Sequence, residues 1–204
     1  VAQWDALLDG HVLVLGVARS GKSTALAALA QGGLLVPADV SGAWDVIAAL
    51  EQSRDVVVAI DDLDSLLARF PAEYKDAAIE RLLRLLRDGP ARGVVVVLAA
   101  QRLTADLHSL AALVTGRLML RHASKSDIVL AGGDGASFDA TLPPGGGFWK
   151  GARVQVVCDP DPLRFPAAHP PVRPSAARPW AIVSSRTSIV ARKLSAAGFE
   201  VLHL

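Results

Sequence analysis

The stretch of sequence that decides the fold is Gly16-Val17-Ala18-Arg19-Ser20-Gly21-Lys22-Ser23, followed by Thr24. It matches the pattern G-x-x-x-x-G-K-[ST] in full, and it lies between an apolar run at 11–15 and an Ala/Leu-rich segment at 23–31. A strand, a glycine-rich turn and a helix in this order form a loop that binds phosphate groups. The glycines let backbone N–H groups turn toward phosphate oxygens, and the helix N-terminus adds partial positive charge. We therefore predict that residues 16–24 bind ATP together with Mg²⁺.

Three polar side chains are expected around the phosphates. Lys22 is placed to reach the β- and γ-phosphates, and the Ser23 hydroxyl is placed to ligate Mg²⁺. Asp61 directly follows a second apolar run, VVVAI at 56–60. An acidic residue at the carboxyl end of a parallel strand lies at the same sheet edge as the phosphate loop. We predict that Asp61 holds the metal ion through water.

Two further residues are candidates for catalysis. Asp62 is expected to orient or deprotonate the attacking water. Gln101, just past an apolar run at 94–99, is placed to reach the γ-phosphate or its water. The alternatives are that Asp62 or Asp64 only caps the next helix, and that Gln101 only satisfies local backbone groups.

The remaining pattern predicts an α/β fold with a mostly parallel central sheet flanked by helices. Strands buried on both faces alternate with helices in such folds. We expect strands at 11–15, 34–36, 56–60, 93–99 and 117–120, and helices at 23–31, 43–52 and 72–87. The alternating segment 152–158 is expected to form an edge strand.

The domain organisation is predicted from the C-terminal composition. Residues 1–158 form the core domain, and 159–179 holds seven of the chain's twelve prolines, which is typical of an extended connector. Residues 180–204 are expected to form a strand, a helix and a strand. A unit of about 25 residues cannot bury a core of its own, so we expect it to dock on the main sheet.

Composition limits the other possibilities. Apolar residues make up 51% and charged residues 20%, as in ordinary globular proteins, and the net charge of +1 does not indicate a polyanionic partner. The single cysteine, Cys158, excludes an internal disulfide and fits a cytoplasmic setting. The chain begins at Val1, and we expect it to be part of a longer protein.

At these residues the chain resembles the FtsK/SpoIIIE family of RecA-like motor ATPases. The run Ala99-Ala100-Gln101-Arg102 resembles that family's Ala-Thr-Gln-Arg, and residues 124–130 resemble its Ser-rich segment. Leu142-Pro143-Pro144-Gly145-Gly146-Gly147 resembles a Pro-Pro-Gly-Arg-Gly turn of the type VII secretion branch, as does the phosphate loop. The resemblance covers about residues 10–158. It departs from the family at Ala100, at Gly146, where the secretion branch often has Arg, and at Asp62, where the DNA pumps usually have Glu.

The resemblance implies a motor that acts with tandem or neighbouring ATPase domains, as a hexamer in the full assembly. It implies a cytoplasmic domain of a membrane-anchored parent, with a protein substrate favoured over duplex DNA. Arg117 and Arg121 are candidates for an arginine finger, the alternative being solvated strand charges. A DNA translocase domain and a silent ATP-binding docking module remain open. Since the Asp62 carboxylate is one methylene shorter than Glu, we expect little ATP turnover by the isolated piece.

Overall fold

The computed structural model describes residues 4–157, and the account of the fold concerns these residues alone. The predicted connector at 159–179, the predicted strand–helix–strand unit at 180–204 and Cys158 lie outside the described residues. The elements are, in chain order, α1 (Ala6–Asp9), β1 (Val12–Leu15), α2 (Lys22–Leu29), β2 (Leu34–Leu35), α3 (Val40–Leu50), β3 (Val56–Ile60), α4 (Leu63–Arg69), α5 (Ala72–Asp88), the 3-10 turn η1 (Pro90–Arg92), β4 (Val94–Ala100), α6 (Ala105–Ala112), β5 (Gly116–Leu120), α7 (Lys125–Leu130), the 3-10 turn η2 (Gly135–Ser137), β6 (Gly146–Trp149) and β7 (Ala152–Gln155).

One mixed sheet organises these elements, with strand order β2-β3-β4-β1-β5-β6-β7. The five strands from β2 to β5 pair in parallel, and β6 and β7 add an antiparallel hairpin at one edge. The α/β fold with a mostly parallel sheet is thus confirmed. Because β1 lies between β4 and β5, the loop that follows β1 starts in the middle of the sheet's carboxyl edge.

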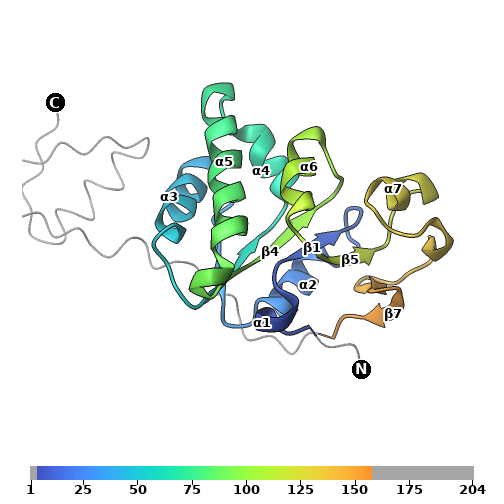
Figure 1. The fold of residues 1–204 in the computed structure, drawn as a ribbon. Helices are drawn as coiled ribbons and strands as arrows, with labels where there is room; N and C mark the ends of the chain where they lie inside the picture. Colours follow the sequence, from blue (N-terminus) through green and yellow to red (C-terminus); the bar gives the residue numbers. More distant parts are fainter. Residues whose placement is uncertain (1–3, 158–204) are drawn as a thin grey trace, which may run out of the picture. The chain divides into compact units, whose positions relative to one another are not determined.

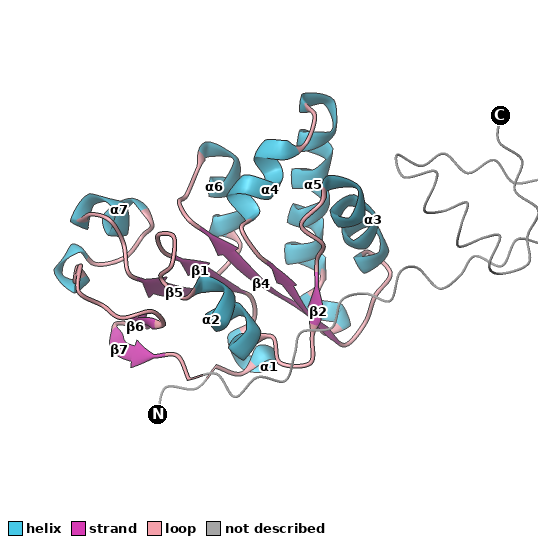
Figure 2. Ribbon diagram, turned by 180° about the vertical axis from the view of Figure 1, so that it is seen from behind, coloured by secondary structure: helices cyan, strands magenta, loops and turns pink. Residues whose placement is uncertain are grey.

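Helices cover both faces of this sheet, but unequally (Figures 1 and 2). Alternate residues of a strand point to opposite faces. On one face, Val94, Val96 and Leu98 of β4 belong to a large apolar cluster that also contains residues of α3, α4, α5 and α6. Val97 faces a smaller cluster, in which Ala25 and Leu26 of α2 are fully or almost fully buried. The helix that contributes to this second cluster, α2, is the one that begins at the glycine-rich loop.

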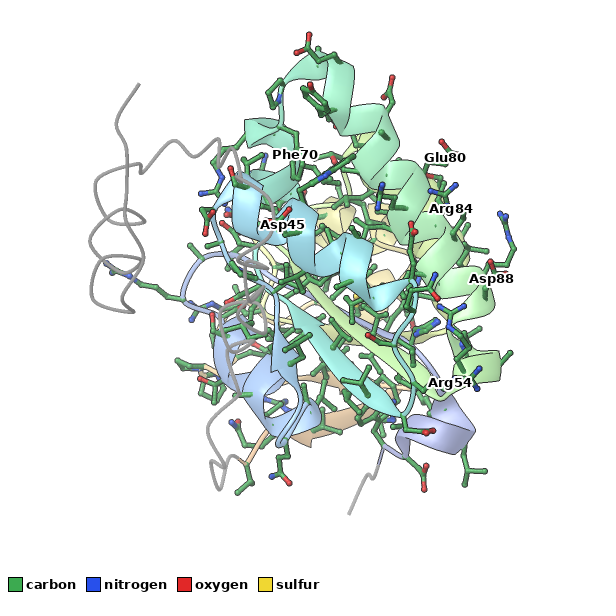
Figure 3. The ribbon with its side chains drawn as sticks, turned by 90° about the vertical axis from the view of Figure 1, so that its left-hand side faces the viewer. Asp45, Arg54, Phe70, Glu80, Arg84 and Asp88 are labelled. Atoms are coloured by element: carbon green, nitrogen blue, oxygen red, sulfur yellow. The ribbon has the colours of Figure 1, made fainter. Side chains whose placement is uncertain are left out.

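Helix α5 shows why the local pattern is readable in this chain. Its buried residues Ala78, Leu82, Leu85 and Leu86 recur at helical spacing along one side. Charged side chains such as Arg84 point away from the sheet on the other side (Figure 3). No helix among residues 4–157 is long and apolar enough to cross a membrane.

The sequence-based expectations differ from the structure mainly by missing short elements. Strand β3 has the predicted bounds, and α5 extends one residue beyond its prediction. Helices α1, α4, α6 and α7 and strand β6 are additional elements. The predicted edge strand at 152–158 is confirmed as β7, which ends at Gln155 and, among residues 4–157, pairs with β6 alone. Strand β6 has the sequence Gly-Gly-Phe-Trp, and pairing with β5 and β7 rather than propensity makes it a strand.

Candidate nucleotide-binding site

The loop that follows β1 is tied to both neighbouring strands. The Gly16 N–H donates to the Ala100 carbonyl of β4 at 3.4 Å, and the Val17 N–H donates to the Arg121 carbonyl beyond β5 at 2.9 Å. Gly16 has no room for a side chain, because a Cβ there would lie 2.5 Å from Ser20 Oγ. The loop therefore curls tightly over its own first residue.

The start of α2 presents an open helix N-terminus to this loop. Gly21 occupies the N-cap position with φ of 95°, in the left-handed region that favours glycine, and it provides no capping side chain. The first N–H groups of a helix have no intrahelical acceptor, so they are available to an anion. Lys22 Nζ donates to the carbonyls of Gly16 at 3.0 Å and Val17 at 3.2 Å, which places its ammonium over the loop.

Ser20 adds an unsatisfied polar atom inside the loop. Its side chain is fully buried, and Ser20 Oγ has no hydrogen-bond partner among the described residues. Buried hydroxyl groups without a partner are uncommon in folded proteins. A phosphate oxygen or a water molecule in the loop would satisfy it, so the loop fits an anionic ligand.

The predicted metal residues meet at the carboxyl edge. The Ser23 hydroxyl donates to Asp61 Oδ2 at 2.6 Å, across the gap between α2 and the end of β3. Asp61 Oδ1 accepts the Asp62 N–H at 2.9 Å, which orients the carboxylate. Mg²⁺ bound to a nucleotide typically takes only one or two protein oxygens and fills its shell with phosphates and water. Within residues 4–157 no cluster of three His, Cys, Asp or Glu side chains could hold a metal. The pair therefore fits a Mg²⁺ ion that arrives with a nucleotide.

The acidic residues after β3 take different positions. Asp62 has φ of 49° and stands at the N-cap of α4, yet its side chain makes no capping bond. Both oxygens of Asp64 accept the Gln101 backbone N–H at 3.2 Å. The Gln101 side chain makes no hydrogen bond to the described residues. Asp62 and Gln101 thus both keep a free polar group near the loop, and Asp64 positions Gln101, which the sequence did not indicate.

The two arginine candidates lie at opposite ends of β5. Arg117, near the amino end, donates to the carbonyls of Ala131 at 2.6 Å and Ala111 at 3.4 Å, which belong to the C-terminal turns of α7 and α6. A cation at two helix C-termini is electrostatically favourable. Arg121 follows the strand and donates to the Leu142 carbonyl at 3.2 Å. Both guanidinium groups are half-buried and engaged inside the domain.

A pocket of about 220 Å³ adjoins the loop beyond the carboxyl ends of β4 and β5, lined by Val17, Gln101, Arg102, His122 and Asp127 among others. His122 is buried, and its Nδ1 lies 2.7 Å from the Leu120 carbonyl. Burial lowers the pKa of His122, although that carbonyl and the charge of Asp127 oppose the shift. No sequence pattern indicated His122, because an isolated histidine after a strand is not a motif.

Comparison with known proteins rests on structure alone. No protein-family model matches the chain, and no curated protein matches it. Similar solved structures include ATPases 2 and 3 of EssC from Geobacillus thermodenitrificans, with 17% identity and a TM-score of 0.51. They also include ATPases 2 and 3 of Thermomonospora curvata EccC in complex with a signal sequence peptide, with 18% identity and a TM-score of 0.57. A third is the pCW3 conjugation coupling protein TcpA with ATPγS, with 17% identity and a TM-score of 0.59.

Each of these alignments covers 74% of this chain, but only 39%, 38% and 60% of the EssC, EccC and TcpA chains. The chain therefore spans less than two thirds of every one of them. Identities this low show a shared fold. The described residues have the phosphate-loop ATPase fold of the EssC and EccC ATPase domains and of TcpA, as the resemblance to FtsK/SpoIIIE-type motors predicts.

Proposed function

We propose that this chain is the ATP-binding domain of an FtsK/SpoIIIE-type translocase motor. The observation that carries the proposal is the contact between Ser23 Oγ and Asp61 Oδ2 at 2.6 Å, which joins the phosphate loop to the carboxyl end of β3. Two segments separated by 38 residues thereby bring a hydroxyl and a carboxylate together beside an open helix N-terminus.

The proposed roles follow from the positions of the side chains. The N–H groups of residues 16–24 and the Lys22 ammonium bind the phosphates. Ser23 and Asp61 hold Mg²⁺, Asp61 through water. When bound, the ion neutralises charge that develops on the phosphate oxygens. Asp62 orients or deprotonates the attacking water, and Gln101, held by Asp64, senses the γ-phosphate.

We expect the isolated domain to turn ATP over slowly or not at all. The Asp62 carboxylate is one methylene shorter than the Glu of related motors, and Arg117 and Arg121 are engaged inside their own domain. An arginine finger supplied by a neighbouring domain would raise the rate. The proposed assembly is therefore a set of tandem or neighbouring ATPase domains, hexameric when complete.

For the substrate we propose a protein, as in a type VII secretion-like system. The turn at 142–147 and the similarity to EccC, whose structure holds a signal sequence peptide, support this choice. The similarity to a conjugation coupling protein supports the alternative, a DNA translocase domain. Tight duplex binding that weakens steeply with salt would favour the alternative. ATP binding without turnover, even in the assembled parent, would favour a silent docking module.

The decisive experiment is titration calorimetry with ATP and Mg²⁺ on Lys22→Ala. We expect the affinity to fall by at least about 100-fold, because two charge-assisted contacts to phosphate are lost. The fold should persist, since Lys22 is half-exposed and bonds only to loop carbonyls.

Lys125→Ala is the matched control. Lys125 is the first residue of α7, as Lys22 is of α2, but it follows the capping residue Ser124 instead of a glycine-rich loop. The control should bind ATP as the unmodified chain does. Equal affinities for the two variants would refute the assignment of the loop.

A further inference from the structure

We propose that the turn at residues 142–147, the bracing turn, positions the phosphate loop by fixing the orientation of one peptide group. This inference rests on the proposed function. It assigns a positioning role to Gly145 and Gln155, which lie about 130 residues after the loop in the sequence.

The bracing turn touches the loop where it becomes α2. The Gly145 N–H donates to the Ser20 carbonyl at 2.8 Å, and both residues are buried. A side chain on Gly21 would collide with the Gly145 backbone nitrogen. The loop and the turn therefore fit each other only with a glycine at position 21.

The same turn is held from behind by the β6–β7 hairpin. The Gly145 carbonyl accepts the Val156 N–H at 2.9 Å, and Gln155 Nε2 donates to the Pro144 carbonyl at 3.0 Å. The Gly146 N–H also closes the turn onto Pro143 at 2.9 Å. Gly145 thus bonds to the loop through its nitrogen and to the strand end through its oxygen.

The planar peptide bond between Ser20 and Gly21 links the contact with Gly145 to the direction of the Gly21 N–H. In a planar trans peptide the C=O and the following N–H point in opposite directions. Since the Ser20 carbonyl points toward Gly145, the Gly21 N–H must point the other way, away from the turn. That direction leads to the concave side of the loop, where successive N–H groups bind phosphate. Without the bond from the turn, the peptide group between Ser20 and Gly21 could rotate, because Gly21 tolerates many backbone conformations.

Ligand and turn must then stabilise each other. A phosphate that binds the Gly21 N–H favours the same peptide orientation that the Gly145 bond favours. Coupling between two sites is reciprocal, so the turn raises nucleotide affinity and the nucleotide protects the turn.

The test compares Gly145→Ala with Gly151→Ala. The two glycines have φ of 80° and 79° and flank β6. Alanine in this left-handed conformation should therefore destabilise the backbone by a similar amount in both variants. A Cβ on Gly151 has nothing within 4 Å, whereas one on Gly145 lies 2.8 Å from Gln155 Nε2. We expect Gly145→Ala to weaken ATP binding by about 3- to 10-fold, because the added methyl group displaces the Gln155 amide and so costs the turn one hydrogen bond. Gly151→Ala should leave ATP binding unchanged.

Amide hydrogen exchange provides the readout that a merely structural role would not move. Pro143 and Pro144 carry no N–H, so a peptide over 142–147 reports mainly on its three glycines. ATP should slow exchange there in the unmodified chain. Gln155→Ala should reduce this protection, while Arg153→Ala, an exposed residue of the same strand, should not. If Gly145→Ala does not fold, the comparison of Gln155→Ala with Arg153→Ala still tests the positioning role.

The outcomes separate the two proposals. If the unmodified chain does not bind ATP, the proposed function fails. The positioning role is wrong, and the proposed function stands, if the unmodified chain binds ATP without slower exchange at 142–147 and Gly145→Ala or Gln155→Ala binds ATP as tightly as its control.

Discussion

The two ends of the parallel strands differ in how their polar groups are used. At the carboxyl ends, the polar side chains of Lys22, Ser23, Asp61 and Asp62 are half-exposed or exposed. Lys22 bonds to the loop and Ser23 bonds to Asp61, whereas the Asp62 side chain makes no capping bond, and an open helix N-terminus lies between them. At the amino ends, His11 and Arg117 use their nitrogens to close gaps inside the fold. The polar groups of the first end stay accessible, as the proposed ligand binding requires, and those of the second end hold the sheet and helices together.

At the amino end, both ring nitrogens of His11 form hydrogen bonds inside the fold. Its Nδ1 accepts the Val96 N–H at 2.9 Å, so the proton of the neutral ring sits on Nε2, which donates to the Leu86 carbonyl at 2.8 Å. The Leu86 carbonyl needs this donor, because the residue four positions on is Pro90, which has no N–H. One buried ring thus joins β4 to the last turn of α5.

The comparison predicts that substitutions at the amino end change stability and leave ligand binding intact. The largest effect is expected for His11→Ala. It leaves two buried backbone groups, the Val96 N–H and the Leu86 carbonyl, without a hydrogen-bond partner and opens a cavity. At about 1–3 kcal/mol for each unsatisfied group, we expect the free energy of unfolding to fall by about 3–5 kcal/mol. Urea denaturation measures the loss. His11→Asn, which can still accept the Val96 N–H, should lose less.

ATP affinity of the folded His11→Ala protein should equal that of the unmodified chain when measured well below its melting temperature. A loss of ATP affinity in a folded sample of His11→Ala would contradict the separation of roles between the two ends, since it would show that they are coupled.

At the carboxyl end the expected effect is smaller in energy and opposite in kind. Asp61→Asn keeps an oxygen for the Ser23 hydroxyl but removes the charge. We expect the Kd for ATP with Mg²⁺ to rise by about 10- to 100-fold, which corresponds to losing one charge-assisted contact. The melting temperature should stay unchanged within about 2 °C, because Asp61 is half-exposed.

Chelation of the metal is the control for this variant. With EDTA the two proteins should bind ATP with similar affinity, because the carboxylate acts through Mg²⁺. A defect of the same size with and without the metal would mean that Asp61 supports the loop directly.

The smallest predicted effect is a pH dependence. It sharpens the comparison because, within residues 4–157, each end carries one buried histidine. Burial lowers the pKa of His11 and of His122. Both folded-state values lie below the unfolded value of about 6.5. Above pH 6.5 this stability is fully present, and it is lost as the pH falls, because the unfolded chain then binds more protons.

We therefore expect the free energy of unfolding to decrease between about pH 7.5 and about pH 5.5, above the range in which carboxylates titrate. His11→Asn and His122→Asn should each flatten the curve. The His11 variant should have the larger influence, since protonation of Nδ1 also breaks the bond to Val96. A slope that neither substitution changes would assign the pH dependence to other groups.

The sequence by itself determined the features that depend on neighbouring residues. An apolar run, a glycine-rich loop and a helix specify a phosphate loop locally, because strand ends, left-handed glycines and helix N-termini are short-range properties. The bounds of β3 and the apolar side of α5 were predictable for the same reason. That Asp61 lies beside Ser23 at one sheet edge was predictable, because a parallel sheet aligns the carboxyl ends of its strands.

Only the tertiary structure decided which distant groups meet. The strand order β3-β4-β1-β5 brings Asp64 to the Gln101 N–H, and the added hairpin brings Gly145 to Ser20. The same folding places His11 between Val96 and Leu86. These contacts join residues up to about 125 positions apart, and no local pattern encodes a partner at that distance. They form because buried backbone groups must find a partner somewhere in the folded chain, and only the packing of the elements determines where.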